Sequence, residues 1–253
     1  EAVISVPANF PEPARKATFD AAELAGLKVR RLINEPTAAA LAFGLKRSKT
    51  EGRVVVFDFG GGTLDVTVLE MMEGILDVRA SFGDPALGGK DFDEALVGML
   101  RQRFQGGHPR AQVGPRAAED LRSVAETVKI QLSRHAETVA RCANYASEDG
   151  SPLDLELDVT RQEFEGLVAP LLDRARVCLV QALEKARLQP AEVEHVLLVG
   201  GTTYIPSVRQ LVASVFGREP RRDVDPDLAV AQGAAIEAAL IAGAIPAEVA
   251  PIK

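Results

Sequence analysis

The sequence predicts an α/β fold in which helices alternate with the strands of a mixed sheet, and three observations support this prediction. Short apolar runs of strand length alternate with longer segments of helical periodicity along the chain. Residues 54–68, VVVFDFGGGTLDVTV, form two strand-like runs around a glycine turn, which predicts an antiparallel hairpin. Residues 195–201, HVLLVGG, read as a buried strand. Hairpin strands within a strand–helix alternation favour a mixed rather than a purely parallel sheet.

Composition limits the classes of function. With 253 residues, 47% of them hydrophobic, the chain can form one large or two modest domains with their own cores. No run approaches the roughly 18 apolar residues of a membrane helix, and a net charge of −7 without a long Lys/Arg run disfavours nucleic-acid binding. Cys142 and Cys178 lack metal-ligand or redox spacing, which suits buried thiols in a reducing cytoplasm. The chain opens at Glu1 without an initiator methionine, so we expect a piece of a longer protein.

Strand and helix alternate at the start of the chain. Pro13 and Pro36 each stand near the predicted start of a helix, and Gly26 is a stop signal for the first helix. The polar segment KRSKTEGR at residues 46–53 is a candidate domain boundary. In chain order the predicted elements are a strand at residues 2–7, a helix at 13–26, a strand at 28–33 and an alanine-rich helix at 37–45.

The remaining elements follow the glycine hairpin. Asp91 is an N-cap candidate, Pro170 is expected to bend or break a long helix, and Pro226 is expected at the first position of the last helix. Residues 87–186 are expected to be mainly helical, with one strand, and to form an inserted subdomain. The predicted elements are a strand at residues 75–84, a helix at 91–105, a loop at 105–114, a helix at 115–134, a strand at 154–160, a helix at 161–188, a strand at 195–201, a helix at 205–217 closed by Gly217, and a helix at 225–243 with Gly243 past its end.

The glycine turn of the hairpin is a candidate phosphate site. Glycines at residues 60–62 let backbone N–H groups approach an anion closely, and Thr63 adds a hydroxyl. This is not a Walker loop, because no Gly-Lys-Ser/Thr follows and the next element is a strand. Asp58 and Asp65 flank the turn, and carboxylates beside a phosphate repel it unless a divalent cation such as Mg²⁺ intervenes. From the residues alone, a plain glycine hairpin with two turn aspartates is an equally good interpretation.

Three further places have both a functional and a plain structural interpretation. Gly200 and Gly201 end the buried strand just before a helix, whose N-terminal amides attract anions, although a tight turn is favoured from the residues alone. Glu35 lies between a strand and a helix, where it can orient a water for attack on a phosphate or serve only the helix N-terminus. On the helix at 115–134, one face carries Glu126, Lys129 and Ser133. For these residues a solvated face with one ion pair is favoured.

Six stretches of the sequence occur in the order in which they stand in one family, and together they cover nearly the whole chain. They are AVISVPANF, LINEPTAAALAFGL, VVVFDFGGGTLDVTV, GGKDFDEAL, VLLVGGTTYIPSV and DVDPDLAVAQGAAIEAAL. Each alone is moderately specific, but six in order are highly specific. The sequence therefore resembles the 70-kDa heat-shock chaperones, in their actin-like nucleotide-binding domain. The resemblance implies an actin-like ATPase (ribonuclease H-like) fold whose two lobes close over ATP or ADP and Mg²⁺, and whose ATP hydrolysis controls the binding of unfolded polypeptides.

The resemblance also implies a domain organisation, with one complete lobe, its helical insertion and the end of the other lobe. Residues 1–46 correspond to the C-terminal part of lobe I, residues 47–86 and 187–253 to the core of lobe II, and residues 87–186 to the inserted subdomain IIB. The implied partners are a J-domain co-chaperone, a nucleotide exchange factor on subdomain IIB, a peptide-binding domain and unfolded clients. Neither nucleic acid nor a membrane is expected as a partner, and the expected location is the cytoplasm.

The resemblance assigns roles to individual residues. Glu35 matches the catalytic glutamate, Asp65 the aspartate near the attacking water, and Asp58 the carboxylate that meets Mg²⁺ through water. Glu35 also lies near the metal, and Thr63 near the β- and γ-phosphates. The implied nucleotide contacts are Gly60, Gly61, Gly62, Thr63, Gly88, Gly89, Lys90, Glu126, Lys129, Ile130, Ser133, Gly200, Gly201, Thr202, Tyr204 and Asp227. The positions implied in relaying the nucleotide state, or in contacting the J-domain and the interdomain linker, are Pro7, Arg15, Arg31 and Asn34.

The sequence departs from the family in several places. Tyr204 stands where the family usually has an arginine stacked on adenine, Ile130 replaces an arginine found in many relatives, and Asn9 replaces an aromatic residue. A tyrosine still offers a flat face to adenine. The family's first glycine-threonine phosphate loop and its phosphate-contacting lysine have no match, so we expect very slow hydrolysis or none from this chain. The alternatives are an actin-like scaffold, a sugar or acetate kinase of the same fold, and a domain that binds ADP only structurally. An uncovered edge of lobe I would favour self-association.

Overall fold

The computed structural model describes residues 1–45, 52–72, 75–221 and 225–245, and within them it has the mixed α/β architecture that the sequence predicts. The strands are β1 (Ala2–Val6), β2 (Val29–Asn34), β3 (Gly52–Phe59), β4 (Leu64–Met72), β5 (Ile75–Asp84), β6 (Gln112–Val113), β7 (Glu137–Glu148), β8 (Ser151–Thr160) and β9 (His195–Val199). The helices are α1 (Glu12–Leu24), α2 (Glu35–Leu45), α3 (Gly89–Gly107), α4 (Ala117–Leu132), α5 (Arg161–Ala186), α6 (Pro206–Phe216) and α7 (Ala229–Ile241).

The central sheet has the strand order β5-β4-β3-β9 and is mixed, as predicted. The glycine hairpin pairs β3 with β4 antiparallel, and the buried strand β9 lies parallel to β3 on its other side. In the hairpin register Asp58 stands directly opposite Asp65. β3 and β9 therefore both end beside the glycine turn, which brings the two predicted glycine sites to one edge of the sheet.

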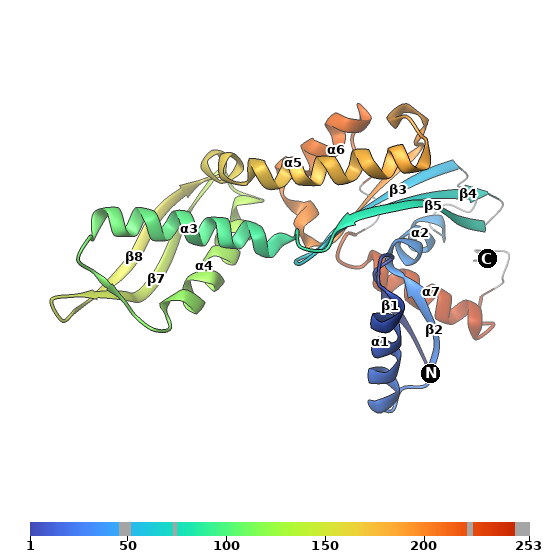
Figure 1. Cartoon of the computed structure of the whole chain (residues 1–253), viewed down its shortest axis with the longest axis horizontal. Coiled ribbons are helices and arrows are strands. Elements are labelled where there is room, and N and C mark those ends of the chain that lie inside the picture. Colours follow the sequence, from blue (N-terminus) through green and yellow to red (C-terminus); the bar gives the residue numbers. More distant parts are fainter. Residues whose placement is uncertain (46–51, 73–74, 222–224, 246–253) are drawn as a thin grey trace.

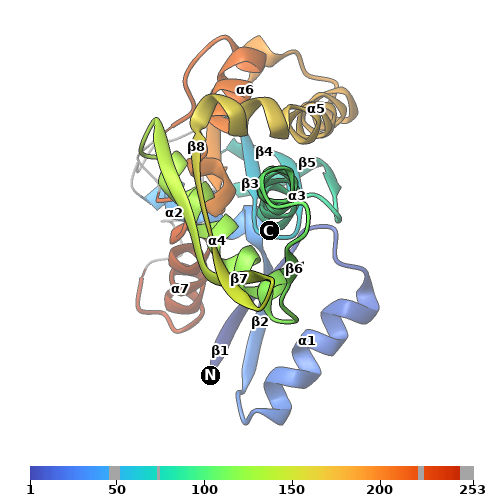
Figure 2. The same ribbon diagram turned by 90° about the vertical axis from the view of Figure 1, so that its left-hand side faces the viewer.

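Alternate side chains of β3 enter two hydrophobic cores, one on each face of the central sheet. Val55, Phe57 and Phe59 pack in the larger core, which includes residues of α3, α5 and α6. Val54 and Val56 pack in the smaller core, with residues of α2 and α7. Figure 1 shows α5 and α6 above the sheet and α2 and α7 below it, and Figure 2 gives the view at right angles. Apolar residues at consecutive positions of β3 follow from this two-sided burial.

Between β5 and α5 the chain forms an arm that extends away from the central sheet (Figure 1). The arm contains α3 and α4 and the antiparallel sheet β6-β7-β8. Residues 87–186 are therefore mainly helical, as predicted, but the prediction of a single strand in them is wrong. Two strands were not predicted, the two-residue β6 and the longer β7. β7 has a register shift between Cys142 and Ala146 and a positive φ of 52° at Asn144. This irregularity interrupts the alternation of apolar and polar residues by which strands are recognised.

α5 continues as one helix through the exposed Pro170, so of the predicted bend or break the break is absent. Two predicted helix boundaries need correction. Asp91 is not the N-cap of α3, because it lies inside the first turn, and its Oδ2 accepts the N–H of Gly88 at 2.7 Å. α7 begins at residue 229, so Pro226 precedes the helix instead of opening it. The polar connector predicted at residues 46–53 lies largely outside the described residues.

Close packing of α7 on α2 fixes the position of the residues that follow β2. A Cβ added to Gly233 would lie 1.8 Å from the carbonyl oxygen of Ala38, so only glycine allows this approach. Arg31 on β2 contacts Glu237 on α7 at 2.5 Å, and the carboxylate is almost fully buried. Glu35, the first residue of α2, is thereby held beside the central sheet.

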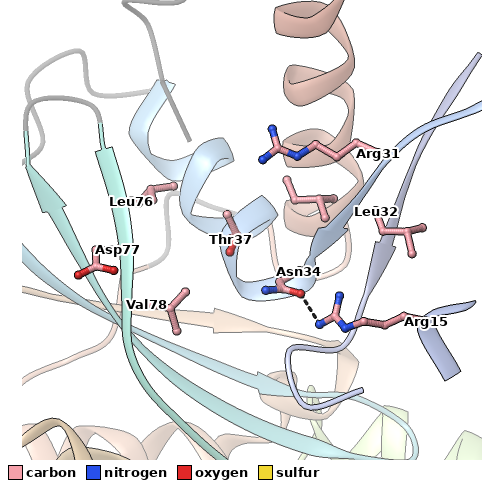
Figure 3. Close-up of a pocket in the computed structure, with 9 residues that line it drawn as sticks. Arg15, Arg31, Leu32, Asn34, Thr37, Leu76, Asp77 and Val78 are labelled. Atoms are coloured by element: carbon pink, nitrogen blue, oxygen red, sulfur yellow. Dashed lines mark hydrogen bonds between the residues drawn. The ribbon is translucent and has the colours of Figure 1, made fainter. Parts of the chain in front are cut away.

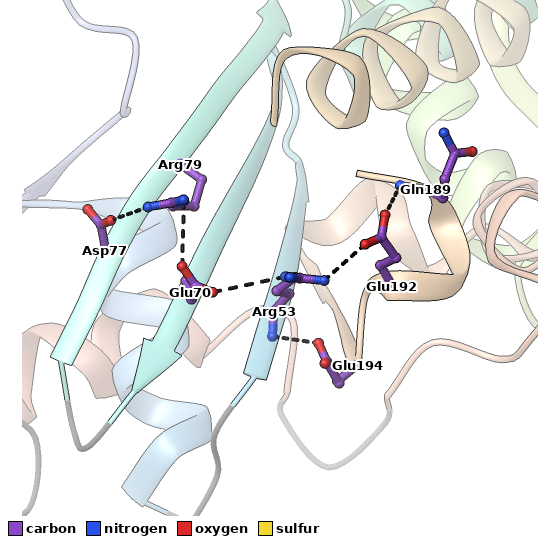
Figure 4. Close-up of polar contacts among 7 residues, drawn as sticks. All are labelled: Arg53, Glu70, Asp77, Arg79, Gln189, Glu192 and Glu194. Atoms are coloured by element: carbon purple, nitrogen blue, oxygen red, sulfur yellow. Dashed lines mark hydrogen bonds and ion pairs between the residues drawn. The ribbon is translucent and has the colours of Figure 1, made fainter. Parts of the chain in front are cut away.

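A ladder of charged side chains crosses the central sheet at the end of β3 that is remote from the glycine turn (Figure 4). Arg79 contacts Glu70 at 3.5 Å, and Arg53 contacts the same carboxylate at 4.0 Å. Arg53 also reaches Glu192 at 3.3 Å. Exposed pairs of this kind typically contribute about 0.2–1 kcal/mol each.

No helix in the described part of the chain combines the length and the apolar character needed to cross a membrane.

Candidate functional site

Three glycine-containing loops converge at the edge of the central sheet. The carbonyl oxygen of Gly60, in the hairpin turn, accepts the N–H of Gly89 at 3.0 Å and the hydroxyl of Thr202 at 2.8 Å. The N–H of Lys90 donates to the carbonyl of Gly61 at 2.9 Å. The turn after β3, the start of α3 and the turn after β9 therefore form one connected unit, as the sequence-based site requires.

Packing within the chain explains the glycines of two of these loops. Gly200 has a φ of +85°, and an added Cβ would lie 2.5 Å from the carbonyl oxygen of Phe59. A Cβ on Gly88 would lie 2.4 Å from the backbone nitrogen of Gly62. At both positions a side chain would collide with the hairpin backbone, so glycine is a condition for the close approach of the loops.

Gly61 and Gly62, at the tip of the hairpin turn, are different. Neither has a positive φ, and a Cβ added to either would meet no atom within 4 Å. Neither backbone conformation nor packing inside the chain therefore requires glycine at these positions. A bare backbone that faces open space leaves room for another molecule to approach the amides closely.

A cavity of about 640 Å³ opens beside these loops. Its lining residues are Gly61, Gly89, Lys90, Asp93, Glu126, Lys129, Ile130, Ser133, Arg134, Gly201, Thr202, Tyr204, Ile205, Arg209 and Asp227. Asp93, Arg134, Ile205 and Arg209 were not predicted, although Asp93 lies one turn after Gly89 in the same motif. The others are residues that the sequence resemblance assigns to nucleotide binding, and the fold brings them together from five separate segments. The remaining predicted glycines, Gly60, Gly62, Gly88 and Gly200, belong to the loops that carry these residues.

Lys129 crosses from α4 to α3 at the wall of this cavity. Its Nζ lies 2.8 Å from a carboxylate oxygen of Asp93 and donates to the carbonyl of Gly89 at 3.1 Å. The two charged side chains are only 12% and 13% exposed. Burial raises the pKa of Asp93, and the ammonium of Lys129 offsets part of that rise. This face of α4 is therefore a packed wall, and its lysine is held by α3.

Two apolar side chains in the cavity are exposed. Ile130 on α4 is 50% exposed and Tyr204 is 38% exposed. The Tyr204 hydroxyl donates to Asp225 at 3.1 Å, and the guanidinium of Arg209 lies 5.6 Å from the centre of the ring. Burial and the neighbouring carboxylates raise the pKa of Tyr204 to about 12, which keeps the phenol neutral. The cavity thus combines a polar wall with an anchored aromatic ring and an aliphatic side chain, surfaces that suit a flat ring.

Three carboxylates, Glu35, Asp58 and Asp65, gather beside the hairpin turn and are called the carboxylate trio below. Burial raises the pKa of Asp58 to about 7, and the charges of Glu35 and Asp65 act in the same direction. Burial and Asp65 raise the pKa of Glu35. Burial also raises the pKa of Asp65, against a lowering by a hydrogen bond from Asn9. No cationic side chain is among the groups that shift these three pKa values.

The carboxylate trio has the chemistry of a site for a hydrated cation. Among the described residues, no group of three or more His, Cys, Asp or Glu side chains is arranged to hold a metal ion directly. Mg²⁺ commonly keeps several of its waters and meets carboxylates through them. Clustered carboxylates with raised pKa values fit an ion held in that way, because a nearby cation offsets the cost of burying their charges as well as the repulsion on Glu35 and Asp58.

A second group of predicted residues lies around the end of β2. The Arg15 guanidinium donates to Asn34 Oδ1 at 2.6 Å and to the carbonyl of Pro7 at 3.3 Å. Arg15, Arg31 and Asn34 line a separate cavity of about 370 Å³, together with residues of β5 (Figure 3). These four predicted residues are thus neighbours, at a distance from the larger cavity. Thr63 lies instead with Asp65 at the rim of a third cavity, of about 430 Å³.

Comparisons with known proteins agree with the sequence pattern. The family model described as Hsp70 protein matches residues 1–252. The chaperone protein DnaK of Thermus thermophilus is 47% identical over 248 residues, which cover 97% of this chain and 40% of that protein. DnaK of Cenarchaeum symbiosum is 44% identical over 98% of this chain and 38% of its own length. DnaK of Thermotoga petrophila is 44% identical over 96% of this chain and 41% of its own length. The chain thus spans about two fifths of the length of these curated relatives.

Proposed function

Because this chain belongs to the Hsp70 family, we propose that it forms the nucleotide-holding lobe of an ATP-dependent chaperone. In this proposal the cavity of about 640 Å³ takes the adenosine of ATP or ADP, and the hairpin turn takes the β- and γ-phosphates. The observation that carries the proposal is the pair of glycines at 61 and 62, which nothing inside the chain requires. A Cβ added at either glycine would meet open space, and Gly61 lines the cavity, so a polyphosphate would have room beside this turn.

We assign the base and the sugar of the nucleotide to opposite parts of the cavity. Ile130 and Tyr204 are exposed large side chains of the lining, so a purine between them would cover apolar surface of both. Glu126, Lys129 and Ser133 follow on the same helix face, and we assign them to the ribose side. Asp227 and the turn at 200–202 close the cavity from the direction of β9.

The carboxylate trio is assigned to Mg²⁺ and to the attacking water. Asp58 and Glu35 would hold the ion through its water ligands, and the ion would supply positive charge beside the phosphates. Asp65 and Glu35 accept protons from, and orient, a water near the γ-phosphate, while the Thr63 hydroxyl lies beside it. We further propose that hydrolysis by these residues alone is slow, because in the described part of the chain no cationic side chain is among the groups that shift the pKa values of the trio.

The partners of the whole protein are proposed from the family. Pro7, Arg15, Arg31 and Asn34 would face a J-domain co-chaperone and the interdomain linker, and the arm would contact a nucleotide exchange factor. A peptide-binding domain and unfolded polypeptides complete the scheme. The buried, unpaired cysteines suit a reducing cytoplasm.

Calorimetric titration with Mg-ADP tests this function. Glu126→Ala should weaken binding at least tenfold, because a hydrogen bond to a charged group contributes roughly 1.5–3 kcal/mol. Ile130→Ala should weaken binding about threefold to tenfold, in line with roughly 0.5–1.5 kcal/mol for a stacking contact. Val177→Ala is the matched control, since Val177 is a similarly exposed aliphatic residue of another helix, at 56% against 50% for Ile130. Absence of any heat from the folded wild-type chain would reject the proposal that this lobe holds the nucleotide by itself.

A further inference from the structure

Asn9 reaches from the loop between β1 and α1 to strand β4 of the hairpin. Its side-chain Nδ2 donates to Oδ1 of Asp65 at 2.5 Å, across 56 positions of sequence. Asn9 is exposed, whereas Asp65 is half-buried and belongs to the carboxylate trio. The hydrogen bond therefore joins the β1–β2 unit to the central sheet beside the proposed catalytic carboxylates.

A glycine on the next strand fixes the same carboxylate from a second side. Gly83 on β5 stands opposite Asp65 in the register, and a Cβ at Gly83 would lie 2.8 Å from Asp65 Oδ1 and 2.4 Å from the carbonyl of Leu64. The oxygen Oδ1 thus occupies space that a glycine leaves open and accepts the Asn9 amide there. These two contacts restrict the orientation of the carboxylate and leave its other oxygen available for a further partner.

The loop that carries Asn9 is itself braced. The Arg15 guanidinium donates to the carbonyls of Pro7 at 3.3 Å, Ala8 at 3.2 Å and Phe10 at 3.2 Å. The N–H of Phe10 donates to the carbonyl of Pro7 at 3.2 Å and closes the turn. Because these contacts give the loop a defined shape, the hydrogen bond between Asn9 and Asp65 can transmit a displacement of Asp65 to the whole loop.

We propose that Asn9 is a positioning residue, which holds one oxygen of Asp65 in place and couples the β1–α1 loop to the glycine hairpin. The coupling to ligand rests on the proposed function, since the ligand that moves the hairpin is the nucleotide. The hydrogen bond itself is a property of the free chain and is testable without any ligand.

The ligand-free test measures hydrogen exchange of the Phe10 amide, by NMR or in a peptide that spans the loop. Asn9→Ala and Asp65→Ala are each expected to speed this exchange at least tenfold. Asp65→Asn keeps a side-chain acceptor and should stay within twofold of the wild type, which separates the hydrogen bond from the charge. Gln102→Ala, the loss of an exposed amide on α3, is the matched control and should have no effect.

Exchange in α6, which is remote from the loop, reports whether each variant is folded. If Asp65→Ala does not fold, Asn9→Ala together with Asp65→Asn still decides, because Asn9 is exposed and lies outside both hydrophobic cores. Unchanged Phe10 exchange in Asn9→Ala would overturn the proposal. So would exchange in Asp65→Asn as fast as in a folded Asp65→Ala.

The ligand test repeats the measurement at saturating Mg-ADP. Exchange of Phe10 should slow at least threefold in the wild type and should not respond in saturated Asn9→Ala. A wild-type chain that binds Mg-ADP without a response at Phe10 would overturn the coupling. If calorimetry shows no binding at all, the proposed function fails, and the ligand-free exchange still decides whether Asn9 positions Asp65.

Discussion

Asp58→Asn is predicted to stabilise the free protein, and to do so only above acidic pH. The folded-state pKa of Asp58 is raised from 3.8 to about 7, so between these pH values the folded protein binds more protons at this group than the unfolded chain. The free energy of unfolding therefore falls as pH rises through this window. At 1.36 kcal/mol per pKa unit, the whole pKa shift corresponds to about 4 kcal/mol of unfolding free energy. Nearby water and the protonation of Glu35 reduce this effect, so we expect about 2–4 kcal/mol.

The measurement is urea unfolding of both proteins between pH 4 and pH 8, in the presence of a chelator. The side-chain amide that Asp58→Asn introduces carries no charge at any pH, so the variant should gain about 2–4 kcal/mol over the wild type at pH 8 and almost nothing at pH 4. Asp173→Asn removes an exposed carboxylate of α5 and is the matched control, with a difference near zero throughout. A stability difference between Asp58→Asn and the wild type that does not change with pH would refute the electrostatic origin of the effect. A variant less stable than the wild type at pH 8 would do the same.

Three further predictions test the packing described above. Gly61→Ala should keep the urea midpoint of the wild type and weaken Mg-ADP binding at least tenfold in calorimetry. Gly88→Ala places a Cβ 2.4 Å from the hairpin backbone and should lower the free energy of unfolding by about 2 kcal/mol or more. Equal losses of stability in the two variants would contradict this distinction. Gly233→Ala should cost about 3 kcal/mol or more in urea unfolding, while Gly98→Ala on α3, where an added Cβ meets nothing, should gain about 0.5–1 kcal/mol; a neutral Gly233→Ala would disprove the close helix contact. Arg31→Met leaves the buried carboxylate of Glu237 unpaired and should lower the free energy of unfolding by about 3 kcal/mol in urea. If the pair is only a surface contact, urea unfolding should show no such loss.

Local sequence patterns correctly predicted the elements whose structure depends on residues close to them in the chain. The glycine hairpin and the buried strand β9 appear where the alternation and the turn residues predict them, and Gly217 ends α6 with a φ of +64° as its position suggests. β7 was missed because the irregularity at Asn144 interrupts its period. Asp91 was predicted to be the N-cap of α3, but the N-cap is Gly88, three positions earlier. An acidic residue in the first turn and an acidic N-cap residue look alike in the sequence.

The pairings within the site could not be read from local patterns. The pattern of its own helix favoured a solvated face for Lys129, and only the resemblance placed it in the site. Its partner Asp93 stands on α3, and no spacing along the chain links the two. Arg209 faces the ring of Tyr204 from the following helix, and Asn9 meets Asp65 only because the β1–α1 loop folds against the hairpin. The sequence resemblance located most of the cavity lining, because it carries three-dimensional information that the residues alone do not.

The glycines and acids of this chain separate into two groups by what their surroundings require. Gly88, Gly200 and Gly233 are each explained by backbone that a side chain would strike, so their absence of a side chain serves the fold. Gly61 has no such neighbour, and within the described residues no cationic side chain is among the groups that shift the pKa of the buried Asp58. A glycine that packing does not require, or a buried charge without a counter-charge in the chain, is expected where a bound ligand supplies the missing partner. An anion over the bare amides and a cation beside the carboxylates would each supply what is missing, and a magnesium–nucleotide complex brings both charges to adjacent places at once. The uncompensated positions thus argue for one composite ligand more strongly than the cavity does, because an empty volume alone does not specify the sign of the charge that fills it.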